Sequence, residues 1–155
     1  MKASCSVWDR LRSQVQFECE QLNRLVHQYR PLLAKGAETG VDDFETASIG
    51  AMLHAFYNGV ESIFKRIALE IDGELPHGEF WHRELLERMA QPGAARPAVI
   101  SADLCEGLKL YLHFRHVFRS AYVFLLRWDK MAPLAAELEA TLQTLESELR
   151  KFADF

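Results

Sequence analysis

Disulfide chemistry and membrane insertion are poorly supported by this sequence, because it has few cysteines and no long hydrophobic run. The three cysteines, Cys5, Cys19 and Cys105, are odd in number and form no Cys-x-x-Cys pair, which favours free thiols in a reducing compartment. No window approaches the ~20 apolar residues of a membrane-spanning helix, and Met1–Ser6 contains no apolar signal core. We therefore expect a cytoplasmic protein with no membrane partner.

The chain also lacks an excess of positive charge. Its 155 residues carry a formal net charge of -4, whereas broad nonspecific binders of nucleic acid are normally basic. Contact with nucleic acid must therefore come from a local patch, and only the stretch from Gly107 to Trp128 qualifies, because it contains no Asp or Glu. Its basic residues are Lys109, Arg115, Arg119 and Arg127. Guanidinium groups bind phosphate oxygens bidentately and keep their charge, so this stretch suits a phosphate ligand.

Apolar residues recur at helical spacing through most of the chain, and no segment shows sustained β alternation. The length fits one domain over residues 1–155 with its own core. Helices are predicted over Val7–Pro31, with a short resumption before a Gly36–Gly40 loop, from Asp43 to Asp72, over Phe80–Met89, from an N-cap at Ser101 as far as Leu125, and over Asp129–Phe152. This pattern predicts an all-α up-and-down bundle of four long helices plus one short helix.

The fourth of these helices is expected to have two unlike faces. At about 100° per residue, one arc is apolar and is predicted to face the core. It comprises Leu110, Phe114, Val117, Phe118, Ala121, Phe124 and Leu125. The opposite arc carries Arg115, His116, Arg119, Ser120 and Tyr122. Leu112, Val123 and Leu126 share that arc, and such apolar residues beside a chemical face favour packing against a second subunit.

Three stretches resemble the HepT-like branch of the HEPN superfamily, a group of small α-helical ribonuclease toxins. They are Leu53–Glu61, then Ile71–Pro76 together with Trp81–Leu86, and finally Phe114–Tyr122. In this order and spacing they cover roughly Ile49 to the C-terminus, about two-thirds of the chain. The resemblance implies a HEPN-type bundle.

The resemblance also implies an activity, partners and site residues. It implies a homodimeric endoribonuclease that cleaves tRNA or mRNA with neither a metal nor a cofactor, as the toxin of a toxin–antitoxin module. The partner would be a nucleotidyltransferase antitoxin that transfers AMP to a tyrosine. In the motif Arg-x4-His-x-Tyr of these toxins, Arg115 matches the arginine, Tyr122 matches the modified tyrosine, and Ser120 occupies the histidine position.

Ser120 is a departure with chemical consequences. Cleaving RNA without a metal needs a base for the ribose 2′-hydroxyl and an acid for the leaving oxygen, which imidazole provides near neutral pH and a serine hydroxyl does not. His116 lies one turn before Ser120 on the same face and offers a substitute imidazole. A shift of about 5 Å along the helix nevertheless usually ruins catalytic geometry.

Two functions therefore stay open. In the first, the chain is a ribonuclease in which Arg115 holds the scissile phosphate and His116 substitutes for the missing histidine, and the retained Arg115 and Tyr122 favour it. In the second, it is a catalytically degenerate dimer that binds a nucleotidyltransferase or RNA without cutting, which Ser120 favours. Purely structural roles also stay open. Arg115 and Arg119 are consistent with solvated surface residues, and Tyr122 is consistent with a half-buried tyrosine of the bundle.

A metal site is disfavoured by the pattern of the histidines. Helix bundles bind di-iron through paired Glu-x-x-His motifs, but Glu74-x-x-His77 runs through Pro76 in a turn and leaves Glu79-x-x-His82 alone. His113 and His116 form a possible ligand pair with no carboxylate nearby. His27 and His54 lie within amphipathic helices and are expected to be structural.

Overall fold

The computed structural model describes residues 5–154 as a bundle of α-helices. The helices are α1 Val7–Thr39, α2 Asp43–Ile67, α3 Trp81–Met89, α4 Ala102–Ser120 and α5 Trp128–Ala153. A π-helical turn, Ala68–Asp72, follows α2, and a 3-10 turn, Val123–Leu125, follows α4. No β-strand occurs in this range, so the predicted all-α class is confirmed. Residues 1–4, part of the segment where we expect no signal core, lie outside the described residues.

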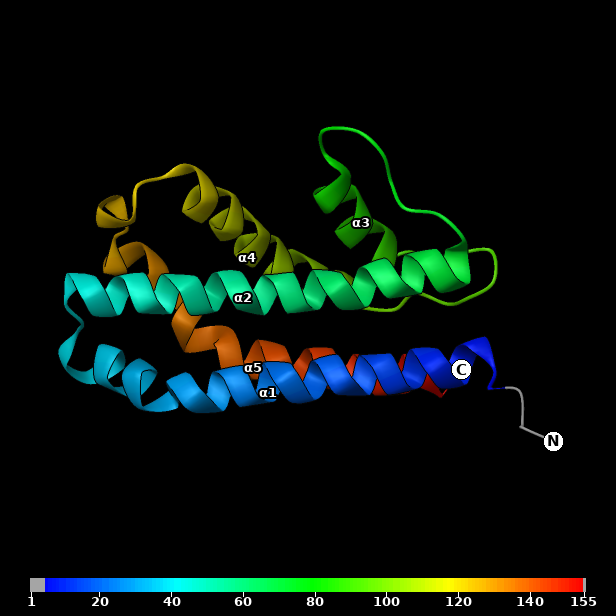
Figure 1. Ribbon diagram of the computed structural model, residues 1–155, viewed down its shortest axis with the longest axis horizontal. Coiled ribbons are helices and arrows are strands. Elements are labelled where there is room, and N and C mark those ends of the chain that lie inside the picture. Colours follow the sequence, from blue (N-terminus) through cyan, green and yellow to red (C-terminus); the bar gives the residue numbers. More distant parts are fainter. Residues whose placement is uncertain (1–4, 155) are drawn as a thin grey trace.

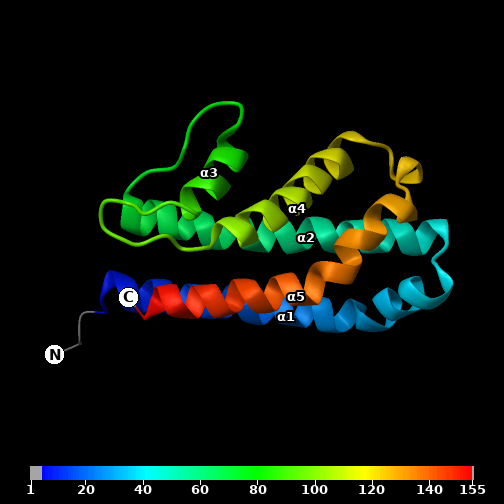
Figure 2. The same ribbon diagram turned by 180° about the vertical axis from the view of Figure 1, so that it is seen from behind.

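The four long helices run up and down, as predicted (Figures 1 and 2). Helix α2 returns along α1, α4 crosses α2 obliquely, and α5 lies beside α1 and antiparallel to it. The short α3 packs against α2 and α4. Helix α2 is the centre of the bundle, and its buried side chains include Phe56, Val60 and Phe64, each with no exposed surface. The bundle thus joins α2, α3 and α4 into one side and α1 and α5 into the other.

Side-chain caps fix where the central helices begin. Asp42 accepts a hydrogen bond from the Glu45 amide at 2.8 Å, and the Glu45 carboxylate accepts one from the Asp42 amide. This capping box satisfies donors that the first turn leaves unpaired. Ser101 caps α4 in the predicted way, because its hydroxyl oxygen accepts from the Leu104 amide at 3.1 Å.

The predicted break at Pro31 is wrong, because α1 continues through it to Thr39. A proline removes one backbone donor and crowds the preceding turn. The residues beyond it are held by tertiary contacts: Leu33 packs on the core, and a Cβ atom on Gly36 would lie 2.6 Å from Cζ2 of Trp128 in α5. Packing of this kind commonly outweighs local helix preference.

The fourth helix ends earlier than predicted, at Ser120 rather than near Leu125. Ala121 is extended, and the chain turns back through the 3-10 turn so that α5 can pack antiparallel to α1. On this return, Leu126 packs against α2, where a Cβ on Gly50 would meet its Cδ1 atom at 3.0 Å. A continuous helix would carry Leu126 and Trp128 away from these contacts, so closure of the bundle ends α4.

The predicted core face of α4 is also wrong for most of its members. Leu110 and Val117 of α4 are exposed, as are Phe124 and Leu125 beyond its end, whereas Phe114 is buried. The residues of α4 that enter the core are Leu104, Cys105, Leu108, Tyr111 and Phe114. Conversely, Leu112 and Leu126, expected to face a second subunit, pack partly on the core of this chain. A different arc of α4 faces α2, because Phe114 is buried, Arg115 bonds to Asn58 of α2 and the Phe118 ring lies against His54 of α2.

An ion pair between the buried Arg96 and the partly exposed Asp72 anchors the connection from α2 to α4. The Arg96 side chain is 2% exposed and donates to both carboxylate oxygens of Asp72, at 2.7 and 2.8 Å. It also donates to the carbonyl oxygens of Gln91 and Pro97. The loop that carries α3 is therefore held at both of its ends.

Among helices formed by residues 5–154, none combines the length and hydropathy needed to cross a bilayer.

Candidate functional site

A groove between α3 and α4 gathers most of the chemistry-bearing side chains of these two helices. Its volume is about 490 Å³, within the usual range for ligand sites. The lining residues are Glu79, Phe80, His82, Arg83, Lys109, Leu112, His113, Arg115 and His116. Two of the residues named from the sequence as catalytic, Arg115 and His116, thus lie together in one groove. They share it with His82 and His113.

A short chain of hydrogen bonds from α2 holds Arg115 in place. Its Nε donates to Oδ1 of Asn58 on α2 at 2.8 Å, and the Asn58 amide nitrogen lies 3.4 Å from Nδ1 of His54. Within residues 5–154 its two terminal guanidinium nitrogens make no hydrogen bond or ion pair. A guanidinium fixed through Nε and open at its outer edge is arranged to bind a phosphate oxygen pair.

His54 supports this arrangement in its neutral form. Burial, and then the nearby charges of Arg115 and Arg119, lower the pKa of its imidazole below the usual value. Its ring lies against Phe118, with ring centroids 5.0 Å apart. Its Nε2 atom is buried and has no hydrogen-bond partner among the described side chains and backbone. The positive charge of the site therefore resides on arginine and not on His54.

A second pair of residues at the groove is formed by Glu61 and His82. Glu61 lies on the buried face of α2 with only 4% of its surface exposed, and its Oε2 atom is 2.7 Å from Nδ1 of His82. The His82 ring stacks on Trp81 with ring centroids 3.7 Å apart. A buried carboxylate is costly unless it is paired, so this contact fixes the position of His82 at the groove.

The other cations of the groove are paired with acids. Lys109 lies 2.8 Å from a Glu106 oxygen and 3.5 Å from one of Glu87, and the hydrogen bond to Glu106 is the main cause of its raised pKa. Arg83 also pairs with Glu87, at 3.1 Å. These exposed pairs are weak and can exchange for a phosphate. Arg115 is therefore the groove arginine most available to an anion.

The remaining predicted site residues lie outside the groove. The hydroxyl of Ser120 donates to the backbone oxygen of His116 at 2.7 Å, at the end of α4. Tyr122 lies beyond the helix, is 73% exposed, and stacks on Phe124 with ring centroids 5.4 Å apart. Arg127 pairs with Asp129 at 3.1 Å. Arg119 is exposed on the last turn of α4, one turn past Arg115.

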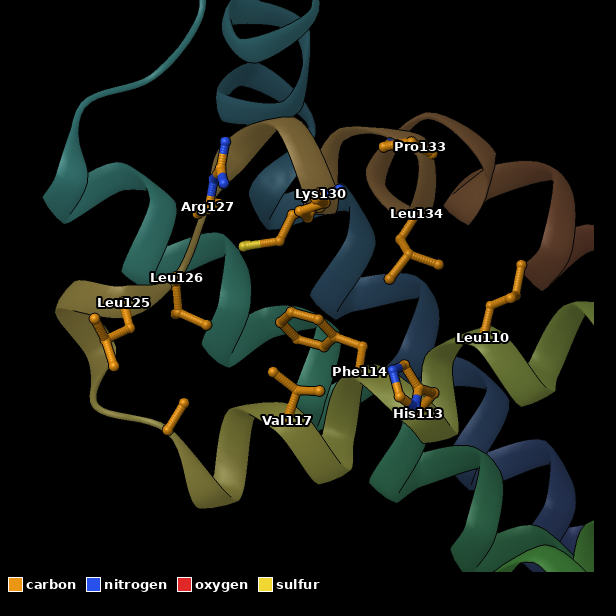
Figure 3. Close-up of a pocket in the computed structure, with 12 residues that line it drawn as sticks. Leu110, His113, Phe114, Val117, Leu125, Leu126, Arg127, Lys130, Pro133 and Leu134 are labelled. Atoms are coloured by element: carbon orange, nitrogen blue, oxygen red, sulfur yellow. The ribbon is translucent and has the colours of Figure 1, made fainter.

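An apolar pocket of about 470 Å³ lies on another face of α4. Figure 3 shows Phe114, Val117 and Leu126 directed into it, with Arg127 and Lys130 at its edge. Next to it, the return segment after α4 exposes a run of large apolar residues: Tyr122, Val123, Phe124 and Leu125. A hydrophobic surface of this kind beside a pocket is typical of a protein interface.

Sequence reasoning missed Asn58 and Glu61, and considered His82 only as a metal ligand. Both α2 residues lie within the stretch that carries the family resemblance, and Glu61 interrupts an otherwise apolar helix face. A polar residue on an apolar face was the available signal, since buried polar groups need partners.

No group of three His, Cys, Asp or Glu side chains that could hold a metal ion occurs among residues 5–154.

The fold and the groove define a HEPN-type helical bundle with a histidine-lined, arginine-bearing site. Comparison with family models supports this class: residues 48–155 match the model described as HepT-like protein. The chain therefore belongs to the HepT-like family of the HEPN superfamily. The matched region begins near the start of α2 and includes every residue of the groove. Comparisons with curated proteins and with solved structures give no match.

Proposed function

We propose that this chain is a metal-independent endoribonuclease, acting on tRNA or mRNA in the cytoplasm as the toxin of a toxin–antitoxin pair. One observation carries the proposal: Arg115, with an open guanidinium edge, lines the same groove as His82, His113 and His116. Strand cleavage without a metal requires a phosphate anchor and imidazoles for proton transfer. Membership of the HepT-like family adds support.

Within this proposal, Arg115 holds the scissile phosphate and stabilises the charge that develops on it. His116, the adjacent groove residue, transfers a proton in place of the histidine that position 120 lacks. Ser120 has no direct part in the chemistry, because its hydroxyl bonds to the backbone of its own helix. Lys109, Arg119 and Arg127 contribute only to the attraction of the RNA backbone.

Cleavage of RNA by the purified chain tests this function. We expect native protein to cleave total tRNA or mRNA in the presence of EDTA. His116→Ala should lower the rate by about 10²-fold or more, as loss of a proton-transfer group does. Ser120→Ala is the matched control and should cleave like the native chain. The proposal is contradicted if native protein leaves all RNA intact, or if cleavage disappears with EDTA.

The catalytically degenerate alternative is favoured by one observation, the absence of any imidazole at position 120. It expects RNA binding without cleavage in the native chain. Ser120→His should then create cleavage, because the four-residue spacing of the toxin motif is restored. Gain of activity in this variant, from a silent native chain, would establish the alternative.

The proposal includes a homodimer. Phe124 is 78% exposed and lies beside an apolar pocket of about 470 Å³. In a two-fold dimer, each copy can therefore insert its Phe124 ring into the apolar pocket of the other copy. We expect light scattering to give twice the chain mass for native protein and the monomer mass for Phe124→Ser. Phe17→Ser, which alters an exposed phenylalanine on α1, is the control. A native monomer, or a Phe124→Ser dimer, contradicts this arrangement.

The proposed partner is a nucleotidyltransferase that transfers AMP to Tyr122. The phenolic hydroxyl suits modification because the residue is 73% exposed and lies outside the helix. Mass spectrometry of the chain after incubation with ATP and such an enzyme should place AMP on Tyr122. Modification of Tyr122→Phe to the same extent would rule out this site.

A further inference from the structure

The contact between Glu61 and His82 has a specific chemical consequence. When the imidazole is neutral, the nitrogen that faces a carboxylate carries the proton, because a carboxylate only accepts hydrogen bonds. Nδ1 of His82, 2.7 Å from Glu61, therefore donates, and Nε2 is left with a free lone pair. Nε2 makes no hydrogen bond within the described part of the chain. His82 is thus held in the tautomer that accepts a proton through Nε2.

The surroundings of this pair differ on its two sides. Glu61 is 4% exposed on the core side, while 26% of the His82 side chain is exposed and lines the groove. A carboxylate behind an imidazole orients the ring and fixes its tautomer. The pair therefore has a buried, fixed end and an open end that faces the groove containing Arg115.

We propose that His82 is the general base of this groove and that Glu61 is its positioning residue. The proposal rests on the ribonuclease function proposed above and supplies the proton acceptor that Ser120 cannot be. The motif on α4 does not contain this pair, because the imidazole of His82 comes from α3 and the carboxylate of Glu61 from α2. Arg115 and His116 complete the site from α4.

The reaction that this arrangement supports is an internal transesterification of RNA. Nε2 of His82 takes the proton of a ribose 2′-hydroxyl as its oxygen forms a bond to the adjacent phosphorus. The bond from phosphorus to the 5′-oxygen breaks, and that oxygen takes a proton from the imidazolium of His116. The products are a 2′,3′-cyclic phosphate and a 5′-hydroxyl. No water, metal or oxidant enters the balance.

Other charged groups lie around His82 and must be left unchanged in a test. From α2 these are Glu61 and Lys65, which lies over the Trp81 ring. From the α3 region and α4 they are Glu79, Arg83, Lys109, His113, Arg115 and His116. Of these, Glu61 alone contacts the ring of His82 through a hydrogen bond in the structure. Its charge is therefore the one whose removal should change the pH profile most.

Single-turnover cleavage of a short RNA across a range of pH tests the assignment. We expect His82→Gln to lower the maximal rate by about 10²-fold or more, while affinity for the same sequence in uncleavable 2′-deoxy form changes little. Glu61→Gln keeps an acceptor oxygen but removes the charge, so it should retain activity with the acidic limb of its profile moved to lower pH. His77→Gln, an exposed histidine before α3, is the control. Free imidazole should restore cleavage to His82→Gly, which separates lost chemistry from lost folding.

The outcomes distinguish this inference from the function on which it rests. If native protein cleaves RNA and His82→Gln cleaves equally well, His82 is not the base, although the ribonuclease function stands. An unchanged pH profile in folded Glu61→Gln contradicts the role of the carboxylate. If native protein binds RNA but cleaves none at any pH, both the ribonuclease function and the role of His82 are wrong.

Discussion

Replacing Arg96 with methionine is expected to lower the free energy of unfolding by about 2–3 kcal/mol, because hydrogen bonds to a charged group contribute about 1.5–3 kcal/mol. The guanidinium is 2% exposed and bonds to both oxygens of Asp72. Without it, that carboxylate and the carbonyl oxygens of Gln91 and Pro97 lose their donors. These acceptors are only partly buried, so water replaces some of the lost hydrogen bonds, but water does not tie the two ends of the connection from α2 to α4 together and the connection loosens.

Urea unfolding followed by circular dichroism measures this effect. Arg83→Met is the matched control, because Arg83 forms an exposed pair with Glu87, and such pairs contribute at most about 1 kcal/mol. Equal midpoints for Arg96→Met and Arg83→Met would show that the pair of Arg96 with Asp72 does not hold the connection. We also expect Arg96→Met to lower the affinity of the groove for RNA. The reason is that α3, which forms one wall of the groove, is carried by the same connection.

Replacing Arg115 with alanine is expected to lower kcat/KM for RNA cleavage by about 10²–10³-fold, the range found when one preorganised donor to a developing oxyanion is removed. Arg115 is anchored by Asn58 through Nε and is one of the residues that line the groove. Arg119→Ala removes the same charge one turn further along α4, outside the groove lining. It should change kcat/KM by less than about tenfold, because exposed charges are screened.

Two comparisons make this prediction specific. Asn58→Leu leaves Arg115 in place but removes the acceptor of its Nε, so we expect it to lower cleavage more than Arg119→Ala does. Added salt should weaken RNA binding by all of these variants to a similar degree. The reason is that the electrostatic part of the affinity comes from the release of counterions from RNA. If Arg115→Ala and Arg119→Ala have equal effects, the segment acts by charge alone and the groove is not the site.

Much of the fold could be predicted because its signals are local. Asp42 and Ser101 begin helices as caps, and the apolar spacing along α2 and α5 identifies buried faces directly. Continuation of α1 through Pro31 and the end of α4 at Ser120 could not be predicted. Both depend on how Trp128 and the return segment close the bundle, which is a tertiary requirement.

The candidate site was predictable only in part, for a related reason. The sequence identified Arg115 and His116 because they are neighbours within one motif. Their partners, Asn58, Glu61 and His82, come from other helices and are brought in by the packing of α2 against α3 and α4. Helical periodicity reports which face of a helix is apolar, but not which polar side chains meet across two helices.

Binding of RNA in the groove between α3 and α4 should change the ring signals of the histidines that line it, out of the six in the chain. Nuclear magnetic resonance would follow them as an uncleavable 2′-deoxy oligonucleotide is added. We predict that the signals of His82, His113 and His116 move with saturation, while those of the exposed His27 and His77 stay in place. Movement of the His27 or His77 signal with the groove signals unchanged would show that RNA binds elsewhere and that the groove is not its site.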